Sequence, residues 1–280
     1  MTLKIVTDST ADIPPALAQA LGITVVPVYI NIGDESYQDG VELTRETFYS
    51  QLPGYDPYPT TAAPAVATFA DLYERLTAAG ATDILSIHLA SSLSATYNAA
   101  RLGAESAHNA SVTLFDARQI TLGTGLLVLH AAEMASQGRS LAEIVAALEA
   151  RVTRTRVFGM IDTLDSLRRS GRVNWATFGV GSLLRIKPIM MVWQGEISIL
   201  EKVRTSRRAV ARMINLVEAF GPMERLTVLH VQAPEAAAQL RQQAASLFPA
   251  GQEEITVEIT PAIGTHLGLG AVGFAGIAQS

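Results

Sequence analysis

The chain has 280 residues, a formal net charge of −5, a hydrophobic fraction of 49% and no cysteine. This length suggests about two domains, and the lack of cysteine excludes disulfides and thiol catalysis, so we expect no metal and no cofactor. No uninterrupted apolar stretch reaches about 18 residues and no signal-peptide pattern opens the sequence, so we expect a cytoplasmic protein rather than a membrane-spanning or exported one.

The charge is distributed unevenly. Residues 1–150 carry 6 basic and 16 acidic side chains, residues 151–212 carry 13 and 4, and residues 213–280 carry 2 and 6. A basic segment within an acidic protein favours an anionic partner, such as an acidic protein face, a phosphate or a transient contact with a membrane surface; internal pairing is the alternative. We expect no nucleic acid partner, because the pI is about 5.6 and no aromatic residues alternate with the arginines.

Strands and helices alternate in the first half. Residues 3–8 predict a strand, residues 9–21 a turn and a helix, and residues 23–32 a second strand, which is typical of a parallel α/β sheet. Asp8 ends the first strand, where such sheets place ligands, but the next acid is Asp12, so no Asp-x-Asp pair is formed. We therefore expect Asp8 to organise the turn through bonds to the backbone.

Hydroxyl groups precede two of the predicted helices. Residues 33–64 predict loops with one short helix, and Thr61 comes just before a helix over residues 65–79. The buried strand over residues 84–89 leads into the second group, a serine-rich turn made of Ser91, Ser92, Ser94 and Thr96. These hydroxyls can cap the following helix, and the free N–H groups there also favour an anion, so both interpretations stay open.

The strand–helix repeat stops near residue 155. We therefore predict an α/β domain with a mainly parallel sheet over residues 1–155, and an α+β domain with a mainly antiparallel sheet over residues 156–280. In the second domain, Gln194-Gly195 predicts a hairpin turn. Residues 174–184 are apolar nearly all round, which fits a wall against an apolar ligand or ordinary core.

A glycine-rich stretch over residues 264–273 contains His266. Its G-x-G-x-x-G pattern has no strand–helix–strand unit around it, so it is not a dinucleotide site. We expect its glycines to allow close approach of the backbone to a ligand or to another segment. His266 in this predicted loop is either structural or a ligand donor.

Several short motifs follow one another along the chain in a characteristic order and spacing. They are Asp8-Ser9-Thr10-Ala11-Asp12, Thr61-Ala62-Ala63-Pro64, Ser91-Ser92-Leu93-Ser94-Ala95-Thr96-Tyr97, Leu167-Arg168-Arg169-Ser170-Gly171-Arg172-Val173, Ile186-Lys187-Pro188, Glu201-Lys202-Val203-Arg204-Thr205 and Gly264-Thr265-His266. Together they resemble the DegV family, whose best-understood members are fatty-acid-binding subunits of bacterial fatty acid kinase. The family's Thr-Ser-Gln-Pro, Ser-Gly-Thr and Gly-Pro-Gly are changed here at Ala62, Ala63, Ala95 and Leu269.

The resemblance implies one long-chain fatty acid held between the two domains. Its carboxylate would be bound by Thr61, Ser94 and His266, which match the family's hydroxyl and histidine donors. We expect the headgroup loop to be supported by Ser91, Ser92, Thr96 and Thr265. The resemblance further implies that a separate ATP-dependent kinase subunit phosphorylates the acid, and that Arg172 and Arg204 contact it. The chain has no P-loop, so we expect a carrier that presents the acid rather than an enzyme.

The chemistry of a buried fatty acid agrees with this interpretation. A carboxylate removed from water must be fully hydrogen-bonded. Each buried CH2 of the tail contributes about 0.8 kcal/mol to binding. Burying the whole tail requires a long apolar slot, which we expect near residues 174–193. Two alternatives remain. One is a hydrolase with Ser94 as nucleophile and His266 as base, although neither a G-x-S-x-G elbow nor a third acid is identifiable. The other is a lipid sensor without a kinase partner.

Overall fold

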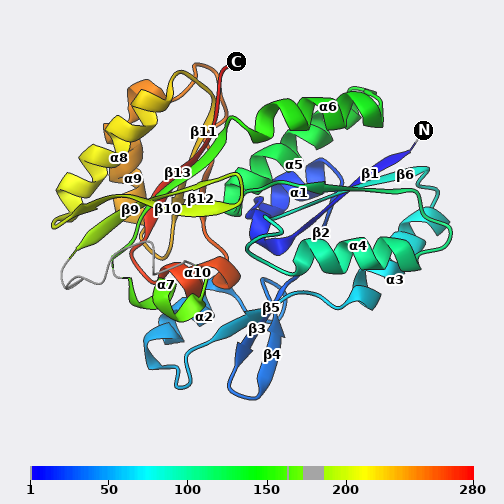
Figure 1. Ribbon diagram of the computed structural model, residues 1–280, viewed down its shortest axis with the longest axis horizontal. Coiled ribbons are helices and arrows are strands. Elements are labelled where there is room, and N and C mark those ends of the chain that lie inside the picture. Colours follow the sequence, from blue (N-terminus) through cyan, green and yellow to red (C-terminus); the bar gives the residue numbers. More distant parts are fainter. Residues whose placement is uncertain (1, 163, 173–185) are drawn as a thin grey trace.

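Strands of the computed structural model form three sheets, and the structure describes residues 2–162, 164–172 and 186–280 (Figure 1). The apolar segment over residues 174–184 therefore lies outside the described residues. Within the described ranges, no helix combines the length and the apolar character needed to cross a membrane.

The first sheet is four-stranded and entirely parallel, in the order β2-β1-β6-β7. Its strands are β1 (Leu3–Asp8), β2 (Ile23–Val26), β6 (Asp83–His88) and β7 (Val112–Asp116). The helices that join or follow them are α1 (Pro15–Ala20), α3 (Val66–Ala78), α4 (Thr96–Ser106), α5 (Thr121–Ser136) and α6 (Leu141–Val152). Val6 and Ile84 pack with α3 and α4 on one face, while Leu85 and Ile87 belong to the core shared with α5. Cover on both faces explains the near-continuous apolar strands.

The second sheet has six strands in the order β10-β9-β8-β13-β11-β12, and only its β11–β12 pair is parallel. Its strands are β8 (Thr155–Met160), β9 (Lys187–Trp193), β10 (Glu196–Val203), β11 (Met223–His230), β12 (Thr256–Glu258) and β13 (Val272–Ala278). The outer face is covered by α8 (Ser206–Phe220) and α9 (Pro234–Gln243), as Figure 1 shows. Gln194 and Gly195, both at positive φ, form the predicted hairpin turn between β9 and β10.

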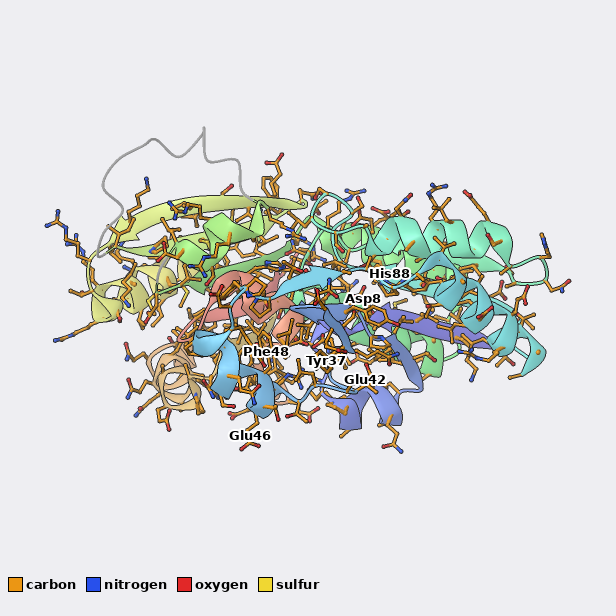
Figure 2. The ribbon with its side chains drawn as sticks, turned by 90° about the horizontal axis from the view of Figure 1, so that it is seen from below. Asp8, Tyr37, Glu42, Glu46, Phe48 and His88 are labelled. Atoms are coloured by element: carbon orange, nitrogen blue, oxygen red, sulfur yellow. The ribbon has the colours of Figure 1, made fainter. Side chains whose placement is uncertain are left out.

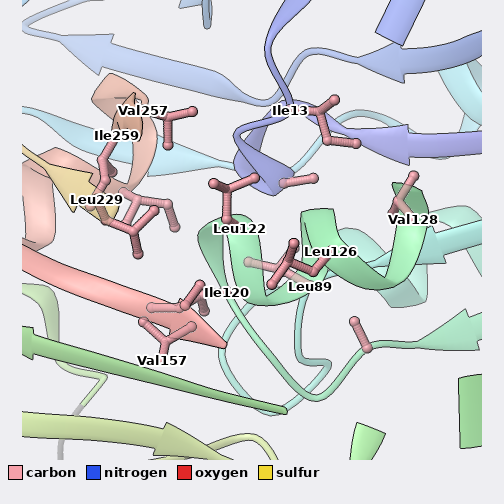
Figure 3. Packing of buried hydrophobic residues seen from close by; sticks show 14 of the residues in the cluster. Ile13, Leu89, Ile120, Leu122, Leu126, Val128, Val157, Leu229, Val257 and Ile259 are labelled. Carbon is pink, nitrogen blue, oxygen red and sulfur yellow. The ribbon is translucent and has the colours of Figure 1, made fainter. Parts of the chain in front are cut away.

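Helix α5 lies between the two larger sheets. Its Leu122, Leu126 and Val128 belong to one buried cluster with Leu89, which follows β6 of the first sheet, and with Val157 of β8 in the second (Figure 3). Most of the helix is buried, including Gly125, where a Cβ would meet the Ala11 carbonyl oxygen at 2.3 Å. The part covered on all sides, residues 121–129, carries no charged side chain, whereas Glu133 near the half-buried end pairs with Arg225.

A small antiparallel sheet, β4-β3-β5, completes the fold together with helices α2, α7 and α10. The bounds are β3 (Tyr29–Ile32), β4 (Glu35–Gln38), β5 (Thr60–Ala62), α2 (Arg45–Gln51), α7 (Asp165–Ser170) and α10 (Pro261–Leu267). In Figure 1, α7 and α10 lie between the six-stranded sheet and this small sheet. Both β5 and α10 carry predicted site residues, so this junction positions the site.

The predicted fold class is confirmed: a parallel sheet with flanking helices precedes a mainly antiparallel sheet covered by helices. Four local predictions are wrong. The loop predicted over residues 33–64 contains the strands β4 and β5 as well as the helix α2. Residues 23–32 form two strands of different sheets rather than one, since the chain leaves β2 before Pro27, which cannot donate to a ladder. His266 lies in the last turn of α10 rather than in a loop, because Pro261 starts a helix there. The predicted glycine-rich loop ends inside an inner strand, because Val272 and Gly273 begin β13 (Val272–Ala278).

Candidate ligand-binding site

A cavity of about 330 Å³ opens where β5, the serine-rich turn before α4, α7 and α10 meet. Its polar lining consists of Thr10, Thr61, Ser94, Thr96, Ser170, Arg172 and His266. Its apolar lining consists of Val28, Ala62, Ala63, Leu89, Leu93, Ala95, Ile120, Leu167, Ile197, Ala262, Ile263 and Leu267. A small polar group within mainly apolar walls is typical of a site for an amphipathic ligand.

Thr61 and His266 meet in this cavity although they are far apart in the sequence. Thr61 lies on β5, opposite Ile30 of β3, and its Oγ1 is 3.1 Å from Nε2 of His266. His266 is held at the end of α10, which stops at Gly268 with a φ of +81°. A glycine adopts this left-handed backbone without the Cβ clash of other residues, so the helix ends directly after the histidine turn.

The electrostatic environment keeps His266 neutral. Burial lowers the pKa of His266 to about 4, and the nearby positive charge of Arg172 contributes in the same direction. At neutral pH the ring therefore carries one proton, on either Nδ1 or Nε2. With the proton on Nε2, the ring donates to Thr61 and leaves the threonine hydroxyl proton free for another acceptor.

Ser94 reaches the same cavity from the turn before α4. Its Oγ accepts the backbone N–H of Thr96 at 3.2 Å and lies 3.0 Å from Thr96 Oγ1. Ser94 thus satisfies one free N–H of the first helical turn, and its hydroxyl also lines the cavity. Within the described part of the chain, the ring nitrogen of His266 pairs with Thr61 rather than with Ser94, so the geometry does not form the nucleophile–base contact of a hydrolase.

Of the four predicted supporting residues, Thr96 lines the cavity, whereas Ser91, Ser92 and Thr265 lie outside its described lining and hold the loops around it. Ser91 Oγ donates to Asp116 Oδ2 at 2.6 Å, and Thr265 Oγ1 donates to the Pro261 carbonyl at 2.8 Å within α10. Ser92 Oγ donates to the Gly195 carbonyl at 2.6 Å. That last bond fastens the serine turn to the tip of the β9–β10 hairpin, so the two halves of the chain meet beside the site.

The two arginines predicted to contact a partner differ in position. Arg204 is exposed just after β10 and is not among the residues that line the cavity. Arg172 is also exposed, but it lines the cavity, and its Nη1 donates to the Ser170 carbonyl at 2.5 Å. Among the described lining residues, Arg172 is the only one with a permanent charge. It can therefore attract an anion into the cavity as well as contact a partner.

Thr10 is a lining residue that the sequence patterns did not reveal. Asp8 accepts bonds from the Thr10 backbone N–H at 3.1 Å and from its hydroxyl, so Asp8 organises the turn as expected. The other Asp8 oxygen is 2.8 Å from Nδ1 of His88, whose Nε2 is 2.8 Å from Ser86 Oγ. Figure 2 shows Asp8 and His88 side by side inside the molecule. This buried network of polar groups holds the side chain of Thr10 in its position at the cavity.

The start of α10 is anchored to the first half by two buried carboxylates. Thr260 donates its backbone N–H to Asp12 Oδ1 at 2.7 Å and its hydroxyl to Asp39. Tyr49 donates its hydroxyl to the carbonyl of Ile259 at 2.6 Å. Burial raises the pKa of Asp12 to about 7, against the lowering effect of Arg45, and burial also raises the pKa of Asp39. These bonds place α10, and with it His266, beside the first half of the chain.

A second, smaller cavity of about 40 Å³ continues the apolar side of the site. It shares Ile120 and Leu267 with the larger cavity. Its remaining lining comes from Thr121 of α5, from the strands β8, β9, β11 and β13, and from Ile161, Ile259 and Ala271 beside those strands. Within the described ranges, no group of three or more histidine, aspartate or glutamate side chains is placed to hold a metal ion.

Comparison with known proteins finds relatives that match nearly the whole chain, in sequence and in structure. A family model described as "Uncharacterised protein, DegV family" matches residues 2–279. A DegV domain-containing protein of Listeria innocua is 35% identical over 274 residues, spanning 97% of this chain and 96% of the relative. A solved structure described as fatty acid binding of a DegV family protein from Thermus thermophilus superposes with a TM-score of 0.91 at 32% identity, covering 100% of both chains. The structure of DegV from Bacillus subtilis, described as a fatty acid binding protein, gives 0.89 at 32%, again covering 100% of both.

Proposed function

Because the chain belongs to the DegV family, we propose that it binds one long-chain fatty acid, with the carboxylate at Thr61, Ser94 and His266. The observation that carries the proposal is the convergence of these three side chains in one cavity whose remaining walls are largely apolar. The Thermus thermophilus and Bacillus subtilis structures, described as fatty acid binding, support the choice of ligand.

The geometry suggests how a carboxylate is received without a buried lysine. Burial keeps His266 neutral, and when its proton is on Nε2 the ring donates to Thr61 Oγ1, which leaves the threonine hydroxyl proton free for the ligand. Ser94 supplies a second hydroxyl in front of the α4 N-terminus, where the helix dipole favours negative charge. Arg172 adds a positive charge at the cavity. A desolvated carboxylate needs such a complete set of donors.

The acyl tail passes between Ile120 and Leu267 toward the inner face of the six-stranded sheet. These two residues line both cavities, so they mark the route from the polar group to the apolar extension. Each methylene that leaves water there contributes about 0.8 kcal/mol. The tail therefore supplies most of the affinity, and the polar group fixes the orientation.

Purified chain, extracted under denaturing conditions, is expected to release long-chain fatty acid close to one molecule per chain. Mass spectrometry of the extract measures both the identity and the stoichiometry of the lipid. The matched sample is the same chain after delipidation, which should take up one equivalent of added palmitate. A chain that releases no fatty acid and takes none up contradicts the proposed function.

The bound acid is presented to a separate ATP-dependent kinase subunit, which phosphorylates its carboxyl group. Support comes from the family resemblance and from the excess of basic residues over residues 151–212 of an otherwise acidic chain, although Arg151, Arg154, Lys187 and Arg212 pair with carboxylates of the chain itself. Arg204 is exposed at this segment, and Arg172 connects the same surface with the cavity. The carrier itself then needs no nucleotide site.

Reversing the charge of Arg204 is expected to separate presentation from binding. Arg204→Glu should lower the rate of fatty acyl phosphate formation by the kinase subunit at least about tenfold, because like charges across an interface repel, while the Kd for fatty acid stays unchanged. Arg139→Glu, on the exposed surface of the first half, changes the net charge equally and should leave both quantities unchanged. An equal loss in both variants, or a loss of lipid binding in Arg204→Glu, contradicts the assignment.

A further inference from the structure

Two glycines face each other across neighbouring strands in the middle of the six-stranded sheet. Gly159 of β8 is paired directly with Gly273 of β13 in antiparallel register. Along the same row, Gly159 pairs with Met190 on β9, and Gly273 pairs with Leu229 on β11. All four residues line the smaller apolar cavity. The sheet face therefore has a trough two strands wide, with Met190 and Leu229 as its walls.

The two glycines are there for different reasons. A Cβ on Gly273 would meet the backbone oxygen of Phe158 at 2.1 Å, so close approach of the chains requires glycine at that position. A Cβ on Gly159 would have its nearest neighbour, the Val272 carbonyl oxygen, at 4.0 Å. No steric contact requires glycine at 159, and a glycine inside a strand weakens it. Its missing side chain leaves space that a ligand can use.

That space lies at the far end of the route described for the acyl tail. The cavity above the trough shares Ile120 and Leu267 with the cavity that holds Thr61 and His266. Its volume of about 40 Å³ exceeds the roughly 30 Å³ that one water molecule occupies in the liquid, so it accepts one or two methylene-sized groups. The groups that reach it are the last carbons of a tail.

We propose that Gly159 sets the length of acyl chain that this protein accepts, with the methyl end of the tail lying in the Gly159–Gly273 trough. The proposal rests on the proposed fatty acid binding and adds to it the residue that limits the length of the acyl chain. A side chain at position 159 fills the trough and excludes the last one or two carbons. Shorter acids, whose tails end before the trough, do not meet it.

The test is the Kd of saturated acids of 12, 14, 16 and 18 carbons for the whole chain and its variants. Gly159→Val should weaken binding of the longest acids about tenfold to twentyfold, the loss of two buried methylenes, and leave the shortest unchanged. Gly159→Ala, which adds a single methyl group, should show a smaller shift in the same direction and decides the question if the valine variant does not fold. Thermal unfolding of each variant monitors the fold.

Two further variants separate the possible failures. Gly276→Ala changes another glycine of β13, paired with Arg156, and should leave the chain-length profile unaltered. Thr61→Val should weaken all lengths by one common factor, since it acts on the carboxylate. A uniform loss, or an unchanged profile, in the folded Gly159 variants overturns the proposal while fatty acid binding stands. No binding of any acid by the unaltered chain overturns both.

Discussion

Replacing Thr61 with valine is expected to weaken binding of a long-chain fatty acid by about tenfold to a hundredfold. Valine keeps the shape and the strand preference of threonine but has no hydroxyl, so the carboxylate loses a charge-assisted hydrogen bond worth about 1.5–3 kcal/mol. The ring of His266 also loses its partner at 3.1 Å. Isothermal titration of the delipidated chain with palmitate measures the change in Kd.

The neighbouring threonine provides the control. Thr60 lies beside Thr61 on β5 but points to the opposite face, is exposed and does not line the cavity. Thr60→Val makes the same chemical change on the same strand and should leave the Kd within about twofold of the unaltered chain. Equal affinities for the two variants would mean that the Thr61 hydroxyl does not bind the carboxylate.

The site residues could be predicted from the sequence only in combination. Thr61 precedes a helix, Ser94 lies in a serine-rich turn and His266 lies in a glycine-rich stretch. Each of these positions has an ordinary structural explanation. Their meeting depends on α10, which bonds through Thr260 to carboxylates of the first half. A contact between residues more than 200 positions apart leaves no local sequence pattern. The three residues could therefore be grouped only from the order and spacing of the motifs that contain them.

Local signals also failed where tertiary packing decides the conformation. The glycines over residues 264–273 predict a loop, yet Gly264 lies in the helix α10, where glycine is needed because a Cβ would meet the Tyr49 hydroxyl oxygen at 2.0 Å. Gly273 lies in an inner strand, where a Cβ would meet the Phe158 carbonyl oxygen at 2.1 Å. Both glycines serve close packing, as expected, but packing does not specify the secondary structure. Thr10 was missed because its place depends on the buried Asp8–His88 pair.

Replacing His88 with leucine is expected to lower the free energy of unfolding by about 3–5 kcal/mol. His88 and Asp8 are both fully buried, and their side chains are 2.8 Å apart. Leucine fills a similar volume but leaves the Asp8 carboxylate without its main partner, and it removes the bond to Ser86 and the edge-on contact with Phe69. Urea denaturation followed by circular dichroism measures the change. His108→Leu, at an exposed histidine, should stay within about 0.5 kcal/mol.

A second substitution identifies the cause of the loss. Asp8→Asn keeps an acceptor for the Thr10 backbone N–H but removes the charge, so Asp8→Asn with His88→Leu should recover at least about 1 kcal/mol relative to His88→Leu alone. If the two losses add instead, packing rather than an unpaired carboxylate explains them. The substitution at His88 should also affect ligand binding through Thr10, because Thr10 lines the cavity and its hydroxyl is held by Asp8. Fatty acid affinity should therefore fall in His88→Leu under conditions where that variant is still folded, since a carboxylate that loses His88 competes more strongly for the donors of the adjoining turn.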